Sequence, residues 1–274
     1  MRTAENELLS KHTTFKIGGP CTMYFPENAE EFAALLGDGD CFILGAGSNI
    51  LAPDEGYRGR VVKTSLLSSV EIEGEYIRAW CGASLARVAS AAASEALTGL
   101  EFAAGIPGTL GGGLCMNAGA YGGELSQSVV SSVMLTQKGM TEITDHDFGY
   151  RRSVYSDGGA ALWAVMKLSK GDKNDIHAKM AELASKRRAS QPLELPNAGS
   201  VFKRPEGYFA GKLIEDCGLK GASVGGAQVS QKHAGFIVNT GTATADDVKR
   251  LIELIQKRVF AEFGVRLETE IKFM

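Results

Sequence analysis

The chain has 274 residues, of which 44% are hydrophobic and 22% charged, with a net charge of −3 and a sequence pI of about 5.9. This length predicts two or three packed units, because single hydrophobic cores stop growing near this size. The slightly acidic balance excludes the basic surface of a general nucleic-acid binder. A short basic run at residues 186–188 ends an expected helix and is predicted to be a solvated helix terminus.

Cysteine and histidine usage favours a reducing compartment without a metal centre. The five cysteines are odd in number, far apart and free of any CxxC spacing, which argues against a disulfide framework and a zinc cage. The four histidines are equally dispersed, so no metal site is predicted. The N-terminus is charged too early for a signal peptide, and no apolar run approaches the roughly 18 residues of a membrane span. We expect a cytoplasmic monomer with neither a membrane nor a nucleic-acid partner.

The first elements in chain order are a helix and a buried strand. Asn28, with a glutamate three residues later, predicts a helix start, and an apolar face containing Phe32 follows. The apolar residues 41–44 predict a buried strand that leads into the glycine loop GAGSN, residues 45–49. This loop is similar to the dinucleotide fingerprint GxGxxG, but Ile50 occupies the position of the third small residue. A simple Rossmann domain is therefore not favoured.

Residues 70–99 predict a hairpin followed by a helix. The alternating residues 70–80 surround Gly74, as in a β-hairpin. Ser84 is the expected N-cap of a helix that ends at Gly99. The expected apolar face of this helix comprises Leu85, Val88, Ala89, Ala92 and Ala96.

The stretch GIPGTLGGGLCMNAGAYGGE, residues 105–124, has eight glycines in twenty residues. Glycine costs about 0.5–1 kcal/mol relative to alanine inside a regular element, so a long loop that brings main chain close to a polar ligand is expected. Exposed backbone N–H groups in tight turns form concave anion sites, which predicts a phosphate-bearing cofactor. The alternative is a string of turns in a β-rich domain.

The second half of the chain follows the same periodicities. Its predicted elements are strands at 129–136 and 161–169, a connecting helix at 173–190, a loop from 191 onward, a helix between Thr244 and Gly264, and a last strand at 265–273.

Seven groups of residues carry a resemblance to a known family. In chain order they are TTFKIGGP, LGAGSNIL, GLEFAAGIPGTLGGGLCMNAGAYGGE, FGYRRS, NAGSVFKRP, AGKLIEDCGLKG with GGAQVSQKHAGFIVN, and LETEIKF. Their order and spacing resemble the UDP-N-acetylenolpyruvoylglucosamine reductases, flavoenzymes that make UDP-N-acetylmuramate for bacterial cell-wall synthesis. The resemblance spans nearly the whole chain and is to the shorter type of the family, which lacks a tyrosine-bearing loop over the substrate.

The resemblance implies an α+β fold. A two-lobed FAD-binding domain, similar to the vanillyl-alcohol-oxidase type, is joined to a smaller α/β substrate-binding domain. The first lobe is expected at residues 1–58, with 265–274 returning to it, and the second at 59–172. A connecting helix at 173–190 leads to the substrate-binding domain at 191–264.

The implied cofactor is non-covalent FAD, with NADPH as co-substrate. FAD carries a pyrophosphate, and both glycine segments can offer N–H donors without side-chain obstruction. No histidine lies in these segments for covalent attachment. The expected cofactor-binding residues are Leu44, Gly45, Ala46, Gly47, Ser48, Asn49, Gly108, Thr109, Gly111, Gly112, Asn117 and Gly119.

Three catalytic residues are implied by the resemblance. Hydride delivery to an enolpyruvyl double bond leaves negative charge on the inner carbon and its carboxylate, and Arg151 matches the arginine that neutralises it. The adjacent Arg152 is expected to be a surface residue. Ser200 matches the proton donor and needs a neighbour that stabilises its alkoxide. Glu270 matches the second acidic partner, although strand alternation alone does not separate it from Glu268.

The last domain is expected to meet the UDP-sugar substrate. The candidate substrate-binding residues are Lys203, Arg204, Lys212, Lys220, Gln228 and His233. The chain departs from the family pattern at Thr13, where asparagine is usual, and at Ala198, where proline is common. Arg204 also stands where the family has an asparagine expected to touch substrate.

We therefore expect NADPH-dependent reduction of the enolpyruvyl ether of UDP-N-acetylglucosamine, with NADPH and substrate binding alternately. One alternative is a related FAD-dependent oxidase that uses oxygen, which the missing histidine disfavours. Another is a non-catalytic flavin- or nucleotide-binding regulator. The joint presence of Arg151, Ser200 and Glu270 argues against this loss of activity.

Overall fold

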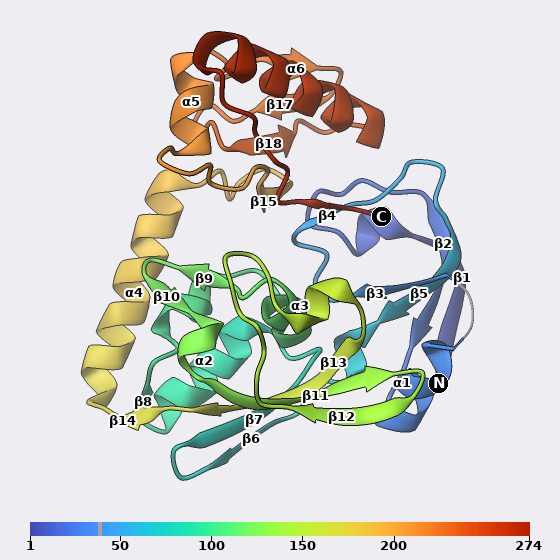
Figure 1. Ribbon diagram of the computed structural model, residues 1–274, viewed down its shortest axis with the longest axis vertical. Helices are drawn as coiled ribbons and strands as arrows, with labels where there is room; N and C mark the ends of the chain where they lie inside the picture. The colour runs from blue at the N-terminus through green and yellow to red at the C-terminus, as the bar shows by residue number, and fades with distance from the viewer. Residues whose placement is uncertain (38–39) are drawn as a thin grey trace. The chain divides into compact units, whose positions relative to one another are not determined.

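The computed structural model describes residues 1–37 and 40–274, in which helices and strands are mixed as expected for an α+β protein (Figure 1). The chain forms two compact units. Unit 1 comprises Met1–Ala4, Met23–Ala46 and Gly59–Arg187, and unit 2 comprises Glu5–Thr22, Gly47–Arg58 and Arg188–Met274. No helix among the described residues combines the length and the apolar composition needed to cross a membrane.

An antiparallel five-stranded sheet is the largest sheet of unit 1. Its order is β12-β11-β13-β7-β6. The strands are β6 (Val70–Glu73), β7 (Tyr76–Trp80), β11 (Val129–Thr136), β12 (Gly139–Ile143) and β13 (Ala160–Lys167). The predicted hairpin around Gly74 is confirmed as β6 and β7, with Ile72 opposite Ile77. The single strand expected at 161–169 is instead β13 followed by the short β14 (Ser169–Lys170), which pairs with β8 (Leu97–Thr98).

A second sheet has the order β1-β2-β5-β3. Its strands are β1 (Arg2–Leu8), β2 (Pro20–Phe25), β3 (Cys41–Leu44) and β5 (Tyr57–Lys63). Strand β3 pairs in parallel with β5 and places Leu44 opposite Lys63. The strand predicted at 41–44 is confirmed, but its full burial is wrong, because Ile43 is 36% exposed while Leu44 is buried.

Local capping signals set the helix starts of unit 1. The helices are α1 (Ala29–Leu35), α2 (Leu85–Ser94), α3 (Leu110–Cys115) and α4 (Lys173–Ser190). Asn28 accepts a hydrogen bond from Glu31 N at 2.9 Å and Ser84 accepts one from Arg87 N at 3.2 Å, which confirms both predicted N-caps. The predicted end of α2 at Gly99 is wrong, because Ala96 already adopts a left-handed φ of 55°.

Short elements complete the described part of unit 1 and the N-terminal part of the chain. The 3₁₀ helices are η1 (Leu9–Lys11), η2 (Thr64–Leu66), η3 (Glu101–Gly105), η4 (Leu125–Gln127) and η5 (Val154–Asp157), and β9 (Gly119–Ala120) pairs with β10 (Gly123–Glu124).

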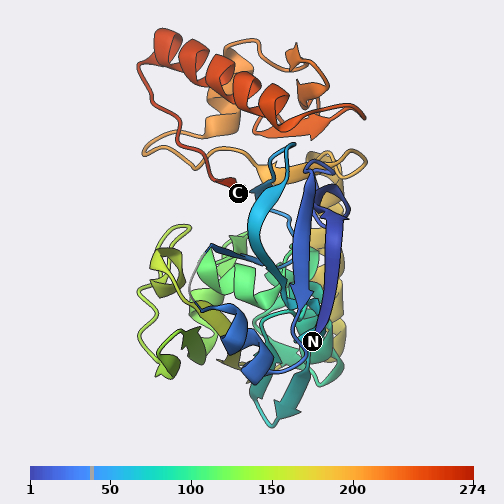
Figure 2. The same ribbon diagram turned by 90° about the vertical axis from the view of Figure 1, so that its right-hand side faces the viewer.

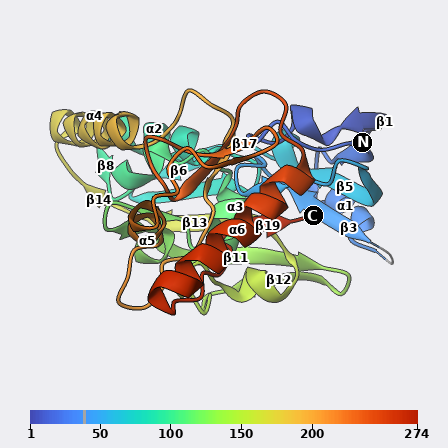
Figure 3. The ribbon, with the colours of Figure 1, turned by 90° about the horizontal axis from the view of Figure 1, so that it is seen from above.

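Unit 2 packs two helices against a four-stranded sheet of order β15-β18-β17-β16. The elements are β15 (Asn197–Ser200), α5 (Ala210–Asp216), β16 (Ser223–Val224), β17 (Ala227–Val229), β18 (Phe236–Asn239) and α6 (Ala245–Phe263). Thr244 caps α6 and Gly264 ends it in the left-handed conformation, so both predicted limits are confirmed. Helix α6 packs against β16 and β17, and Figure 2 and Figure 3 show this long orange-red to red helix in two further views.

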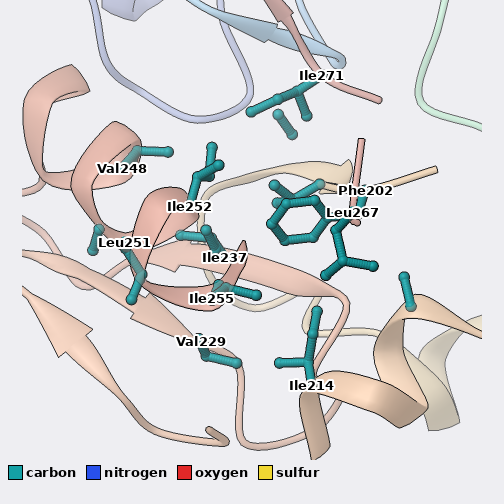
Figure 4. Close-up of a cluster of buried hydrophobic side chains, with 14 of the residues drawn as sticks. Phe202, Ile214, Val229, Ile237, Val248, Leu251, Ile252, Ile255, Leu267 and Ile271 are labelled. Atoms are coloured by element: carbon teal, nitrogen blue, oxygen red, sulfur yellow. The ribbon is translucent and has the colours of Figure 1, made fainter. Parts of the chain in front are cut away.

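The core of unit 2 is built from one face of α6. Val248, Leu251, Ile252 and Ile255 recur at helical spacing and are all buried (Figure 4). Figure 4 shows these side chains gathered with Val229 and Ile237 of the sheet and with Ile214, Phe202, Leu267 and Ile271. This apolar cluster fixes the backbone on which the candidate residues of unit 2 lie.

The predicted last strand at 265–273 is wrong for most of its length. Only β19 (Lys272–Phe273) is a strand, and it pairs in parallel with β4 (Ile50–Leu51). Residues 265–271 are irregular apart from an isolated bridge between Phe202 and Thr269.

The compact units are divided differently from the expected lobes. Residues 5–22 and 47–58, expected in the first FAD-binding lobe, belong to the same unit as the C-terminal residues 188–274. Strands β19 and β4, which pair with each other, both belong to unit 2. The limits of the functional domains stay a prediction.

Candidate functional site

The two predicted glycine segments meet inside unit 1. A Cβ added to Gly45 would lie 2.3 Å from Oγ1 of Thr109, so the residue after β3 approaches the start of α3 too closely for any side chain. Thr109 is the N-cap of α3, and its Oγ1 accepts a hydrogen bond from Gly112 N at 3.5 Å. Of the predicted cofactor-binding residues, these three are brought together.

The prediction that residues 105–124 form a long loop is wrong. They contain the short helix α3 and the β9–β10 pair, and several glycines serve close packing. A Cβ on Gly111 would lie 3.0 Å from Cβ of Cys81, and one on Gly113 would lie 2.9 Å from a methyl group of Leu125. Glycine count alone does not distinguish a need for exposed backbone from a need for close approach.

Three other predicted cofactor residues lie at the ends of regular elements or next to them. Gly108 O accepts a hydrogen bond from Leu85 N at 2.9 Å, which joins the start of α2 to the segment before α3. Leu44 is buried at the end of β3, and Gly119 pairs with Glu124 in the β9–β10 hairpin.

Lys63 is a cationic residue at this place that sequence reasoning missed. Its Nζ donates to the carbonyl oxygen of Gly45 at 2.5 Å. The oxygen and the N–H of one trans peptide point in opposite directions, so this bond directs the Ala46 N–H away from Lys63. The bond therefore fixes the direction of one backbone donor next to Gly45.

Burial lowers the pKa of Lys63 to about 8. Because this folded-state pKa lies below the ordinary value of 10.5, the unfolded chain binds more protons between pH 8 and 10.5. The free energy of unfolding of the wild type should therefore rise with pH in this window. We predict that Lys63→Met lacks this rise, so that the difference between wild type and variant grows by at most about 1.4 kcal/mol per pH unit.

Urea unfolding of ligand-free protein at pH 7.5, 9 and 10 measures this difference. The matched control is Lys138→Met, which removes an exposed lysine from a turn. Its free energy of unfolding should differ from that of the wild type by the same amount at all three pH values. A Lys63→Met difference that does not change with pH would contradict the prediction.

Asn117, predicted to contact the cofactor, has its side chain bonded within unit 1. It is 2% exposed, its Nδ2 donates to Gly149 O at 3.2 Å, and its Oδ1 accepts from Ser126 N at 3.0 Å. The structure therefore connects the glycine-rich segment to the segment that carries Arg151. A direct contact of this amide with the cofactor stays a prediction.

Arg151 lies in a tight turn on unit 1. Its backbone has a φ of 56°, and its guanidinium carbon lies 5.2 Å from the ring centre of Tyr150. The neighbouring Arg152 is exposed and forms a 2.5 Å ion pair with Asp147. This separates the two arginines as expected, with Arg152 at the surface.

The rest of the GAGSN loop contacts other motif segments inside unit 2. Thr14 N donates to Gly47 O at 3.2 Å, and Thr14 Oγ1 donates to Asn197 O at 2.6 Å. Asn49 Nδ2 donates to the carbonyl oxygen of Glu270 at 3.1 Å. A Cβ on Gly199 would lie 3.9 Å from the carbonyl oxygen of Ser48. Four motifs distant in sequence thus converge in one unit.

Gly47, in the loop that contacts these motif segments, cannot be replaced by another residue without backbone strain. Its φ is 67°, and an added Cβ would lie 2.3 Å from the backbone oxygen of His12. We predict that Gly47→Ala destabilises the protein by about 2–4 kcal/mol, since the left-handed conformation and the backbone clash both contribute. Gly74→Ala is the matched control, because Gly74 has a φ of 61° and open space around its Cβ position.

Thermal and urea unfolding measure both glycine variants. The control should lose only the conformational part, about 1–2 kcal/mol. Equal losses in the two variants would show that the contact with His12 costs nothing.

Ser200 and Glu270 lie on neighbouring backbone segments of unit 2. Glu270 N donates to Val201 O at 2.7 Å, so Glu270 is bonded to the residue that follows Ser200. Gly199, with a φ of 75°, produces the irregular register of β15 just before Ser200. Both Ser200 and Glu270 are half-buried.

The structure also separates the two candidate carboxylates. Glu268 has a side chain that is 74% exposed and forms a 3.2 Å ion pair with Lys203. Glu270 is half-buried beside the Ser200 segment. The two carboxylates thus differ in exposure, and the role of Glu270 as the second acidic partner stays a prediction.

The predicted substrate-binding side chains of unit 2 mostly have protein partners. Lys212 pairs with Asp216, Lys220 pairs with Glu215 at 2.7 Å, Gln228 Nε2 donates to Ser223 Oγ at 3.1 Å, His233 Nδ1 accepts from Gly235 N at 3.1 Å, and the Arg204 guanidinium lies 3.9 Å above the Phe209 ring. Burial lowers the pKa of His233, which favours the neutral ring as an acceptor. Their contacts with substrate stay predictions.

The basic run at 186–188 is not uniformly solvated, contrary to expectation. Lys186 is exposed and pairs with Glu182 at 2.5 Å. Arg187 is half-buried, and its Cδ lies 3.3 Å from the Cβ position of Gly105. Burial lowers the pKa of Arg187, and the nearby Tyr121 phenol opposes this shift. The sequence run gave no sign of this packing, because the contact joins residues far apart in the chain.

Two regions of the chain match known protein families. Residues 23–145 match the profile described as FAD binding domain, and residues 191–274 match UDP-N-acetylenolpyruvoylglucosamine reductase, C-terminal domain. The UDP-N-acetylenolpyruvoylglucosamine reductase of Clostridium tetani is 46% identical over 97% of this chain and 90% of its own length. The enzyme of that name from Caldanaerobacter subterraneus is 48% identical over 98% of this chain and 92% of its own length.

A solved structure gives the same result. The crystal structure of UDP-N-acetylenolpyruvylglucosamine reductase from Thermus caldophilus superposes with a TM-score of 0.89 at 35% identity, covering 100% of this chain and 99% of the other. The fold, the matched regions and the chain-long identity agree. The chain therefore belongs to the UDP-N-acetylenolpyruvoylglucosamine reductase family.

Proposed function

We propose that this chain reduces UDP-N-acetylglucosamine enolpyruvate to UDP-N-acetylmuramate with NADPH and non-covalently bound FAD, a step of peptidoglycan precursor synthesis. The observation that carries the proposal is the similarity to enzymes named for this reduction over 97% of the chain. Both the FAD-binding region and the reductase C-terminal domain are matched.

The residues of unit 1 fit FAD. Gly45 leaves no side chain between β3 and Thr109, and the Ala46 N–H is directed away from Lys63. Such backbone donors can bind a pyrophosphate without obstruction. When bound, FAD supplies the hydride chemistry, so the protein needs only to bind substrate, position it and manage charge and protons.

Arg151 is proposed to neutralise the substrate carboxylate as charge develops beside it. A guanidinium is permanently protonated and presents paired N–H donors that match a carboxylate. Its backbone conformation is sparsely populated for a residue other than glycine, as is frequent at functional sites.

Ser200 is proposed to donate the proton to the inner carbon of the former double bond. A hydroxyl is a weak acid and needs a partner that stabilises its conjugate base or returns the proton. Glu270 is the proposed partner, supported by its place on the backbone segment bonded to Val201. The half-buried positions of both residues suit a reaction that excludes bulk water.

Substrate binding is assigned to the last domain. The UDP-sugar is proposed to contact Lys203, Arg204, Lys212, Lys220, Gln228 and His233, with cationic side chains facing the diphosphate. We further propose that the chain acts in the cytoplasm as a monomer; the dispersed cysteines support the reducing compartment.

An anaerobic colour assay tests the function. The purified protein should be yellow, bleach on addition of NADPH, and regain its colour on addition of UDP-N-acetylglucosamine enolpyruvate. Recovery of colour with oxygen but not with this substrate would indicate the oxidase. A protein that stays colourless after added FAD would exclude both enzymes and leave the non-catalytic regulator.

A further inference from the structure

The turn that carries Arg151 is closed by backbone bonds at its base. Gly149 N donates to Arg152 O at 3.0 Å and Arg152 N donates to Gly149 O at 3.3 Å, which encloses Tyr150 and Arg151. The left-handed φ of Arg151 is unfavourable for such a side chain and persists only where the surroundings fix it. The contacts that hold the base of the turn therefore determine where the guanidinium points.

One of these contacts comes from Asn117. Its Nδ2 donates to Gly149 O at 3.2 Å, while its Oδ1 accepts from Ser126 N at 3.0 Å. The side chain is 2% exposed, so losing either bond would leave a buried polar group without its partner. Asn117 itself has a φ of 41°, a conformation that asparagine tolerates better than most residues.

A second contact holds the other side of the turn. The carbonyl oxygen of Cys115 accepts from Ser153 Oγ at 3.3 Å and from Ser156 Oγ at 3.2 Å. Residues 115–117 therefore bond to the chain both before and after Arg151. These residues directly follow α3, whose N-cap Thr109 approaches Gly45.

A buried polar cluster fixes the strand end next to the turn. Ser132 Oγ lies 2.8 Å from His146 Nε2 and 2.6 Å from Tyr155 OH, and Val154 N donates to His146 O at 2.9 Å. All three side chains of the cluster are buried. The segments on both sides of the turn are thus anchored, and the bond from Asn117 is the side-chain connection to Gly149.

We infer that Asn117 is a positioning residue that couples the flavin-binding segment to the Arg151 turn. Helix α3 begins beside Gly45 and ends next to Asn117, so a ligand that orders the start of α3 also orders the base of the turn. This role rests on the proposed function, in which Arg151 meets the substrate. Asn117 then affects the substrate half-reaction without touching the reacting atoms.

Two variants test the coupling in the FAD-loaded protein. Asn117→Gly removes both side-chain bonds and tolerates the positive φ, whereas Asn117→Asp keeps an acceptor for Ser126 N and cannot donate to Gly149. Asn117 is also an expected cofactor-binding residue, so FAD affinity and the rate of bleaching by NADPH are measured in both variants as the reference for any direct effect on the flavin, and reoxidation that slows no more than bleaching would contradict the coupling. Reoxidation by UDP-N-acetylglucosamine enolpyruvate should slow about 10- to 100-fold, since small misplacement of a catalytic group has effects of this size.

Hydrogen–deuterium exchange of residues 146–156 supplies a readout independent of activity. Exchange there should be at least about tenfold faster in both Asn117 variants. The matched control is Asn28→Ala, which removes an asparagine cap in the same unit without contact to the turn, and it should leave exchange and both half-reactions unchanged.

Unchanged exchange at 146–156 in both variants, or an equal effect of Asn28→Ala, would overturn the coupling. A different result would contradict the proposed role of Arg151 without contradicting the coupling. If Arg151→Gln leaves reoxidation unchanged while the Asn117 variants accelerate exchange, the coupling stands and the assignment of Arg151 does not.

Discussion

Replacing Ser200 with alanine is expected to reduce turnover about 10²–10⁴-fold, the usual cost of removing a general acid. Bleaching by NADPH should stay within about twofold of wild type, because reduction of the flavin needs no proton from Ser200. Alanine fits wherever serine fits, and the left-handed residue before it, Gly199, is unchanged. Stopped-flow measurement of the two half-reactions, with anaerobic NADPH and then the enolpyruvyl substrate, separates these effects.

The matched control for this variant is Ser94→Ala. Ser94 is the last residue of α2, is exposed, and its hydroxyl donates to Ala91 O at 2.7 Å. Its loss should change neither half-reaction. If both half-reactions fell equally in a folded, flavin-loaded Ser200→Ala protein, the assignment of Ser200 as proton donor would be wrong.

Elements with local signals could be predicted from the sequence. The caps at Asn28, Ser84 and Thr244 bond to a backbone N–H three residues later, so the evidence for each lies within one helical turn. Gly264 likewise ends α6 through its own left-handed φ of 68°. The α+β class and the order of most long elements follow from such signals and from periodicity.

Elements that depend on distant partners were predicted poorly. Helix α3 forms from a glycine-rich sequence because Gly111 and Gly113 allow close packing against Cys81 and Leu125, which propensity does not register. Among the described residues, the last strand is limited to β19, because its partner β4 has two residues and lies more than 200 residues earlier in the chain.

In the candidate site, too, residues with a sequence signal could be predicted and contacts between distant residues could not. The resemblance supplied Arg151, Ser200 and Glu270, but only the structure shows Glu268 engaged by Lys203 while Glu270 is half-buried. The bonds from Lys63 to Gly45 and from Asn117 to Gly149 span 18 and 32 residues. No periodic pattern marks such positions, so the sequence does not distinguish Lys63 and Asn117 from other strand and turn residues.

Arg151 should carry a comparable share of the reaction through its charge and its paired N–H donors. Arg151→Gln is expected to slow reoxidation by the enolpyruvyl substrate about 10²–10³-fold, in the range found when one charge-stabilising donor is removed, with bleaching by NADPH unchanged. Arg151→Lys should recover part of this loss, because it keeps the charge but not the paired donors. Glutamine and lysine bear the same backbone cost at a φ of 56°, so the comparison isolates the guanidinium. Arg152→Gln, which removes an exposed guanidinium paired with Asp147, is the matched control, and a loss there as large as at position 151 would reverse the assignment of the two arginines.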